Sequence, residues 1–160
     1  MAVRPTGRDR GRILRLAYWN ANSISNKKLE LVLFLSDHGI DICLKNETHL
    51  VLGQDLGMAN YVSQGNDRPT QEGGTMTVVR RGNDYYSVPV SNLRQMEATA
   101  ICVNIGGRPV KLVAVYLSLV DADLFECISG GTPVLLAGDL NAKHKDWNSR
   151  LNSTRAVLLR

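Results

Sequence analysis

Three apolar runs in this chain end in polar side chains that suit a metal ion or a phosphate. Short apolar runs bounded by turn residues are typical of buried strands, and catalytic groups are commonly placed on loops held by such a scaffold. Carboxylate and amide oxygens gathered at three strand ends could hold a hard divalent cation against a phosphate. The runs and the polar residues after them are Ile13–Trp19 with Asn20, Ile40–Leu44 with Asn46, Glu47 and Thr48, and Pro133–Ala137 with Asp139 and Asn141.

Asp139 and Asn141 form the strongest pair, because they lie two residues apart. An extended backbone points side chains at that spacing to one side, and Gly138 is expected to let the chain turn sharply before them. A carboxylate beside a carboxamide can bind Mg²⁺ or place a water next to a phosphate. The alternative is an Asx turn that closes the strand, which is a common local motif.

Glu47 and Asn20 are the next candidates. Glu47 is a natural anchor for Mg²⁺, since that ion keeps several waters and takes few protein carboxylates. Taken alone, Glu47 would more often be a surface loop residue, but its position after a buried strand favours a metal ligand. Asn20 could polarise a phosphate oxygen or fix the aspartate, or it could be a simple turn residue.

Tyr116 ends a predicted strand, where its hydroxyl could reach a phosphate. Packing against a sheet is the more common role of a tyrosine in this position. Beyond Asp139 the chain is basic. Lys143, His144 and Arg150 could contact a nucleic-acid backbone, or they could be solvated surface residues.

The composition is that of an ordinary globular domain, with 160 residues, 44% hydrophobic and 21% charged. The net charge of +4 is compatible with a polyanionic partner but does not require one. The three cysteines fit no metal-binding spacing, so we expect buried, reduced thiols at Cys43 and Cys102 and a protein of the nucleus or cytoplasm. No apolar run approaches the ~20 residues of a membrane span, so no membrane partner is expected.

Secondary structure must position these residues. The sequence predicts a helix over Lys27–His38, capped by Ser25–Asn26 and ended by Gly39. Two glycines at 106 and 107 predict a hairpin. The other predictions are strands over Thr75–Arg80, Asp84–Val90, Glu97–Ile105, Pro109–Leu117 and Thr132–Ala137, a loop over 48–60, and helices over Asp121–Ile128 and Asn152–Leu159. This order favours a layered α/β or α+β domain built on packed sheets.

Several linked motifs resemble the endonuclease domain of non-LTR retrotransposons of the jockey type. That domain belongs to the endonuclease/exonuclease/phosphatase superfamily, which also contains the apurinic/apyrimidinic endonucleases. The resemblance runs from about Leu14 to the C-terminus, and linked motifs are far more specific than any one of them. The motifs are Trp19-Asn20-Ala21-Asn22, Ile42-Cys43-Leu44-Lys45-Asn46-Glu47-Thr48-His49, Gly73-Gly74-Thr75, Gly138-Asp139-Leu140-Asn141-Ala142-Lys143-His144 and Trp147-Asn148-Ser149-Arg150.

The resemblance implies a four-layer α/β sandwich, with two sheets face to face and helices outside. It implies a Mg²⁺-dependent endonuclease, with Mn²⁺ as a substitute ion, that nicks double-stranded target DNA. The resulting 3′ hydroxyl would prime reverse transcription by a polymerase domain downstream in the full element, and we expect a monomer. By position, Glu47 matches the metal carboxylate, Asn20 the asparagine beside it, Tyr116 the phosphate-contacting tyrosine, Asp139 the residue that orients the attacking water, and Asn141 its transition-state partner.

The chain departs from the family pattern in one main respect. The family carries a Ser-Asp-His motif near the end of the domain, whose histidine is a general base or phosphate ligand, and no such motif occurs before Arg160. We therefore interpret residues 13–160 as an incomplete domain that lacks its C-terminal part. Residues 1–12 carry several arginines with Gly and Pro, and we interpret them as a flexible basic arm. Lys45 also replaces an apolar residue in its strand.

Three hypotheses follow from these observations. The chain is the endonuclease domain of a retroelement and nicks DNA, or it is a catalytically dead remnant that binds nucleic acid weakly or has no function. The third hypothesis is a phosphatase of small phosphoesters, because a fold alone does not define a function. The element-like stretches around His144 and Arg150 disfavour the phosphatase. Loss of the histidine motif favours low activity, since even a displacement of 1 Å can lower a rate roughly a hundredfold.

Overall fold

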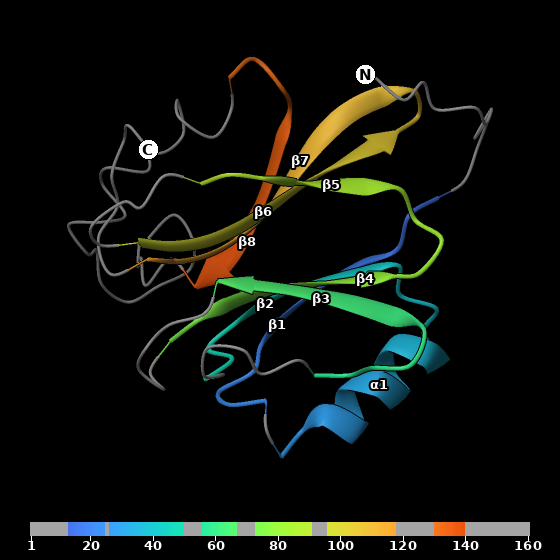
Figure 1. Ribbon diagram of the computed structural model, residues 1–160, viewed down its shortest axis with the longest axis vertical. Helices are drawn as coiled ribbons and strands as arrows, with labels where there is room; N and C mark the ends of the chain where they lie inside the picture. The colour runs from blue at the N-terminus through green and yellow to red at the C-terminus, as the bar shows by residue number, and fades with distance from the viewer. Residues whose placement is uncertain are drawn as a thin grey trace, which may run out of the picture.

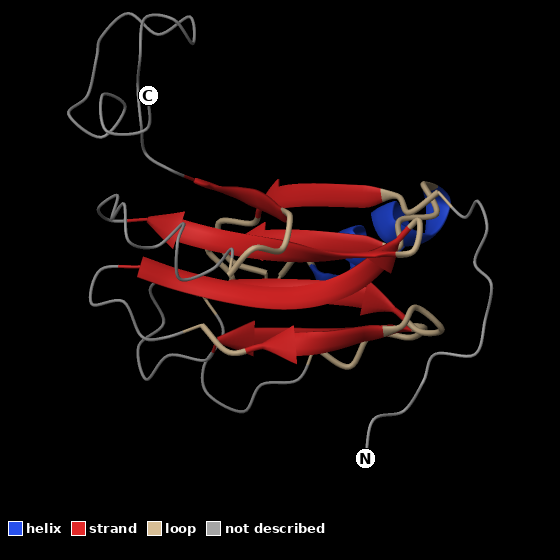
Figure 2. Ribbon diagram, turned by 90° about the horizontal axis from the view of Figure 1, so that it is seen from above, coloured by secondary structure: helices blue, strands red, loops and turns tan. Residues whose placement is uncertain are grey.

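The computed structural model describes residues 13–24, 26–49, 56–66, 73–90, 96–117 and 130–139. Within these ranges, eight strands form two four-stranded sheets that face one another, and helix α1 covers the outer face of the first sheet (Figure 1). The view from above shows that the strands of both sheets run in roughly the same direction and partly cover the helix (Figure 2). No helix in the described ranges is long and apolar enough to cross a membrane.

The first sheet has the strand order β1-β2-β4-β3. Strands β1 (Leu16–Asn20) and β2 (Ile42–Asn46) are parallel and are connected through helix α1 (Lys28–Asp37). Strand β4 (Thr75–Arg80) pairs antiparallel with β2 and with the edge strand β3 (Tyr61–Asn66). A parallel pair needs such a crossover connection, and a helix usually supplies it.

The second sheet has the order β5-β6-β7-β8, and it also ends in a parallel pair. Strands β5 (Tyr85–Val88), β6 (Met96–Ile105) and β7 (Arg108–Leu117) are antiparallel, and β8 (Val134–Asp139) runs parallel to β7. The β6–β7 turn confirms the predicted hairpin, because both of its glycines have positive φ, 60° and 83°. The pair β1–β2 contacts the pair β7–β8 across the sandwich.

The apolar core lies in separate layers, which follow from the alternation of side chains along each strand. Ile42 and Leu44 point between the two sheets, whereas Cys43 points towards α1. A further apolar cluster lines the outer face of the second sheet. Cys43 and Cys102 are buried and free, as predicted. These layers confirm the expected α/β sandwich, although the helix predicted over Asp121–Ile128 lies outside the described residues.

Local details correct several expectations. Asn20 and Asp139 are the last residues of β1 and β8 rather than the first residues of the following loops, because each still pairs with a neighbouring strand. Gly138 lies inside β8 and makes no sharp turn. Glycine is needed here because β8 and β7 approach each other closely, and a Cβ on residue 138 would overlap the backbone carbonyl of Val115. Strand β3 was not predicted, because its sequence is polar and contains Gly65.

The start of helix α1 also differs from the prediction. The N-cap residue is Lys27, and no side chain caps the helix, so the predicted Ser25–Asn26 cap is wrong. The Lys27 ammonium instead donates a hydrogen bond of 2.6 Å to the carbonyl of Ala21. The end of the helix is as predicted, since Gly39 follows it with a φ of 60°. The basic arm over 1–12 and the helix predicted over Asn152–Leu159 lie outside the described residues.

Candidate active site

The polar strand ends of the two sheets lie at the same end of the sandwich. In the first sheet Asn20 is directly opposite Asn46, and in the second Tyr116 is directly opposite Asp139. Alternation along each strand places these side chains on the same faces as the apolar residues that fill the space between the sheets. The layer between the sheets is therefore apolar over most of its length and becomes polar at one end.

Asn46 ties the two sheets together at this polar end. Its side-chain amide donates to the backbone carbonyl of Val115 in β7 and, at 3.4 Å, to the hydroxyl of Tyr18 in β1. Asn46 is fully buried, and its carbonyl oxygen Oδ1 has no hydrogen-bond partner among the described residues. Because Val115 immediately precedes Tyr116, this tie fixes the end of β2 against the end of β7.

Tyr18 is close enough to both candidate carboxylates to be affected by their charges. Glu47 follows β2 of the first sheet, and Asp139 ends β8 of the second. Burial, together with the smaller effects of the negative charges of Asp139 and Glu47, raises the pKa of Tyr18 to about 12. The phenol is therefore protonated at neutral pH. Its oxygen accepts from Asn46, so its own proton is directed elsewhere. With 41% of its surface exposed, Tyr18 can offer that proton to a bound anion.

Glu47 and Asn20 are held by the chain that follows β1. The carbonyl of Glu47 accepts a 2.8 Å hydrogen bond from the amide of Ser23, and Glu47 has a positive φ of 51°. Asn20 accepts a 3.4 Å bond from the amide of Asn22 through its side-chain oxygen. The two side chains therefore come from adjacent, mutually bonded segments at one corner of the site.

These residues fit Mg²⁺ better than a transition metal. The donors are carboxylate and amide oxygens, which hard cations prefer, and Mg²⁺ uses one or two carboxylates with several waters. In the described part of the chain, no group of three or more His, Cys, Asp or Glu side chains is placed to hold a metal. The buried, unpartnered Oδ1 of Asn46 is a further oxygen at the same end.

The structure thus brings together Asn20, Glu47, Tyr116 and Asp139 of the predicted site. Asn141, Lys143, His144 and Arg150 lie outside the described residues, so their roles stay predictions. Sequence reasoning missed Tyr18 and the role of Asn46. A signal was present for Tyr18, which lies two residues before Asn20 on a predicted strand and therefore on the same face.

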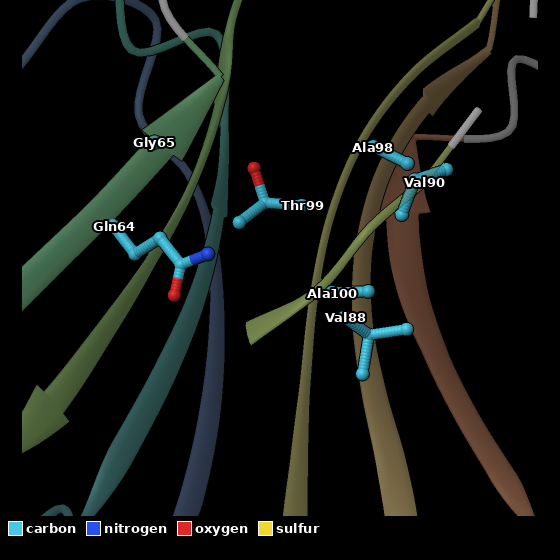
Figure 3. Close-up of a pocket in the computed structure, with 7 residues that line it drawn as sticks. All are labelled: Gln64, Gly65, Val88, Val90, Ala98, Thr99 and Ala100. Carbon is cyan, nitrogen blue, oxygen red and sulfur yellow. The ribbon is translucent and has the colours of Figure 1, made fainter. Parts of the chain in front are cut away.

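A small cavity of about 160 Å³ lies beyond the site, beside β3 and β6. Figure 3 shows Gln64 and Thr99 pointing towards each other across it. The Thr99 hydroxyl also contacts that of Thr75 at 2.8 Å, which ties β6 to β4. The cavity contains none of the candidate catalytic residues. It is lined by Gln64, Gly65, Val88, Val90, Ala98, Thr99 and Ala100.

The two facing sheets and their shared polar end are consistent with a hydrolytic site at the edge of an α/β sandwich. Comparison of the sequence with known families gives the same result at finer detail. The chain belongs to the endonuclease/exonuclease/phosphatase family, whose sequence pattern matches residues 17–159.

Similar proteins include proteins of mobile elements and an AP endonuclease. The chain is 30% identical over 155 residues to the RNA-directed DNA polymerase from mobile element jockey of Drosophila melanogaster, covering 91% of this chain but 17% of that protein. Its fold is similar to the endonuclease domain of TRAS1, a telomere-specific non-LTR retrotransposon, with a TM-score of 0.70, 13% identity, and coverage of 92% of this chain and 68% of that one. An AP endonuclease from Leishmania major matches with a TM-score of 0.62 and 13% identity, over 91% of this chain and 60% of that one.

The position of Tyr18 leads to a first prediction. Replacing Tyr18 with phenylalanine should lower kcat for phosphodiester hydrolysis by about tenfold, because one hydrogen bond to a developing negative charge is lost. KM should change little. Steady-state kinetics on a labelled duplex would measure both constants, with Tyr86→Phe, an exposed tyrosine of β5, as the matched control. A loss confined to KM would show that Tyr18 only binds substrate.

Proposed function

We propose that this chain is the endonuclease domain of a retroelement and hydrolyses one phosphodiester of double-stranded DNA with the help of Mg²⁺, which Mn²⁺ can replace. The observation that carries the proposal is the convergence of Asn20, Glu47, Tyr116 and Asp139 at one end of two facing sheets. Oxygen ligands, a water-orienting carboxylate and hydroxyl donors are the groups that phosphodiester hydrolysis needs.

Each residue has a distinct part in this mechanism. Glu47 and Asn20 would hold the ion through their side-chain oxygens, and a bound ion would supply charge neutralisation at the phosphate and at the leaving oxygen. Asp139 accepts a hydrogen bond from the attacking water and orients it in line with the P–O3′ bond. Tyr116 donates its hydroxyl to a phosphate oxygen. Cleavage of the P–O3′ bond leaves a 3′ hydroxyl and a 5′ phosphate.

Three observations favour DNA over a small phosphoester. Tyr18 is 41% exposed, so its hydroxyl is accessible to a phosphate on a polymer. The chain carries a net charge of +4, which suits a polyanion. Relatives bear the name RNA-directed DNA polymerase and are much longer than this chain. We therefore propose that the nick primes reverse transcription by a polymerase domain of the same parent protein.

The residues after β8 complete the proposal. Asn141 would stabilise the transition state beside Asp139, and Lys143, His144 and Arg150 would contact the DNA backbone. Phosphate contacts of this kind position a protein on DNA without reading its sequence. Substitution of these basic residues should weaken binding to all DNA sequences alike.

The test is incubation of supercoiled plasmid with the purified chain in Mg²⁺ or in chelator. We expect Mg²⁺-dependent conversion to the open-circular form, and the nick should be extended directly by a DNA polymerase because it carries a 3′ hydroxyl. Hydrolysis of p-nitrophenyl phosphate without nicking would instead support a phosphatase. A folded chain that nicks no DNA in Mg²⁺ or Mn²⁺ would contradict the proposal and favour a catalytically dead remnant.

A further inference from the structure

The loop that carries Glu47 is bonded on two sides. On one side, the amides of Ser23 and Ile24 donate to the carbonyls of Glu47 and Thr48 at 2.8 and 3.1 Å. On the other side, the amide of Thr48 donates to the carbonyl of Gly74 at 3.4 Å, and the amide of His49 donates to the carbonyl of Gly73 at 3.0 Å. The metal loop, residues 47–49, therefore lies between the end of β1 and the start of β4.

This loop needs such support because its backbone is strained. Glu47 and His49 both have positive φ, 51° and 53°. Residues other than glycine adopt this left-handed region only where the surrounding structure enforces it. Weakening either set of bonds should let the loop relax to ordinary backbone angles, and the Glu47 carboxylate would then leave its position.

The glycine turn is in turn held by Glu97, which belongs to the opposite sheet. The amide of Gly74 donates to a carboxylate oxygen of Glu97. The Glu97 side chain is buried, with only 4% of its surface exposed. Both glycines have positive φ, 81° and 92°, and the neighbouring side chains approach them closely. A Cβ on Gly73 would meet a Glu97 oxygen at 3.0 Å, and a Cβ on Gly74 would meet the Thr48 hydroxyl at 2.5 Å.

Glu97 also lies beside the reacting end of β7. In the β6–β7 register, Glu97 is directly opposite Tyr116. Glu97 therefore contacts the Gly73–Gly74 turn and is also a neighbour of Tyr116, the proposed phosphate-contacting tyrosine. A hydrogen bond from an amide to a carboxylate is roughly twice as strong as one between neutral groups. Glu97 is thus a strong anchor that joins the two halves of the site.

We propose that Glu97 is a positioning residue for the metal ligand Glu47. It acts through the Gly73–Gly74 turn and the metal loop, and it does not itself touch the ion. The proposal rests on the proposed function only in that Glu47 is taken as the ligand. It predicts that loss of the Glu97 carboxylate loosens the loop and weakens metal binding, although Glu47 is unchanged.

The experiment compares Glu97→Leu, Glu97→Gln and the control Glu30→Leu, which removes an exposed carboxylate from α1. The first readout is amide hydrogen exchange at Thr48 and His49 in metal-free protein. The second is the Kd of Mn²⁺, used alone and measured by the electron paramagnetic resonance of the free ion. Glu97→Leu should speed exchange at both amides at least about tenfold and raise the Kd about 10- to 100-fold.

The conservative variant separates positioning from general packing. Glutamine keeps an acceptor oxygen, so Glu97→Gln should restore exchange and Kd to within about threefold of the original chain. Exchange at Ile101 and Leu112, in the core between the sheets, should be the same in all variants. If Glu97→Leu does not fold, Gly74→Ala disturbs the same link from the other side, through the contact with Thr48.

The outcomes distinguish this inference from the proposed function. Normal exchange at Thr48 and His49 in a folded Glu97→Leu protein would overturn the inference. An unchanged Kd for Mn²⁺ in that variant would overturn it as well, while leaving the metal site of the original chain intact. If the original chain binds no Mn²⁺, the proposed function fails, and the exchange of the two amides still decides whether Glu97 holds the loop.

Discussion

Replacement of Asp139 by asparagine should lower kcat for metal-dependent DNA nicking by about a thousandfold. The side chain keeps its shape but loses the negative charge that we propose orients the attacking water, and groups with such a role typically contribute 10²- to 10⁴-fold. KM should change by less than about threefold, because Asp139 acts mainly in the transition state. Single-turnover nicking of a labelled duplex would measure the effect.

The matched control for this experiment is Asp84→Asn, which changes an exposed aspartate just before β5. It should nick at the rate of the original chain. Thermal melting of Asp139→Asn should show an intact fold, since the side chain lies at the end of a strand rather than in the apolar core. Nicking by Asp139→Asn within threefold of the original rate would exclude Asp139 from the mechanism.

Replacement of Lys45 by methionine should stabilise the protein by about 2 kcal/mol at pH 7. Lys45 is fully buried in β2 on the α1 side, and among the described residues its ammonium has no hydrogen-bond partner. Burial lowers the pKa of Lys45 from 10.5 to about 8, a penalty of about 3 kcal/mol. The ammonium lies 4.6 Å from the ring centroid of Trp19, and a cation–π contact of about 1 kcal/mol offsets part of that penalty.

The pH dependence gives this prediction a definite sign. Between pH 8 and 10.5 the unfolded chain binds more protons at Lys45 than the folded chain, so stability increases with pH in that window. The advantage of Lys45→Met should therefore be full below pH 8 and disappear by about pH 10.5. Urea unfolding across this range would measure it, with Lys28→Met on the exposed side of α1 as the control. A destabilised Lys45→Met at pH 7 would contradict the prediction.

The sequence predicted the positions of the strands better than their ends. Hydrophobic runs identified β1, β2, β4, β6, β7 and β8 because each of these strands contributes side chains to an apolar cluster. The ends were misplaced at Asn20 and Asp139, because a polar residue after an apolar run looks like the start of a loop. In this sandwich, however, the inner layer is polar at one end, so these two polar residues still pair with a neighbouring strand, β2 for Asn20 and β7 for Asp139. The edge strand β3 carries too little apolar sequence to be predicted.

The convergence of the site could be predicted only in part. Strand order shows which residues follow buried strands, but periodicity does not show which strands face each other across a sandwich. The partners that cross between sheets were missed for this reason, namely Asn46 with Val115 and Glu97 with Gly74. Lys45 was noticed as a departure from an apolar strand, yet only the structure places its ammonium over Trp19.

The most direct test of a single metal site is cleavage of the chain by bound Fe²⁺. Fe²⁺ would replace Mg²⁺, and ascorbate with peroxide would generate radicals that cut the backbone next to the ion. We expect cuts near Asn20, Glu47 and Asp139 in the same protein, all suppressed by excess Mg²⁺ and by Glu47→Gln. Cuts confined to one of these segments, or cuts that persist in excess Mg²⁺, would show that the strand ends do not share one ion.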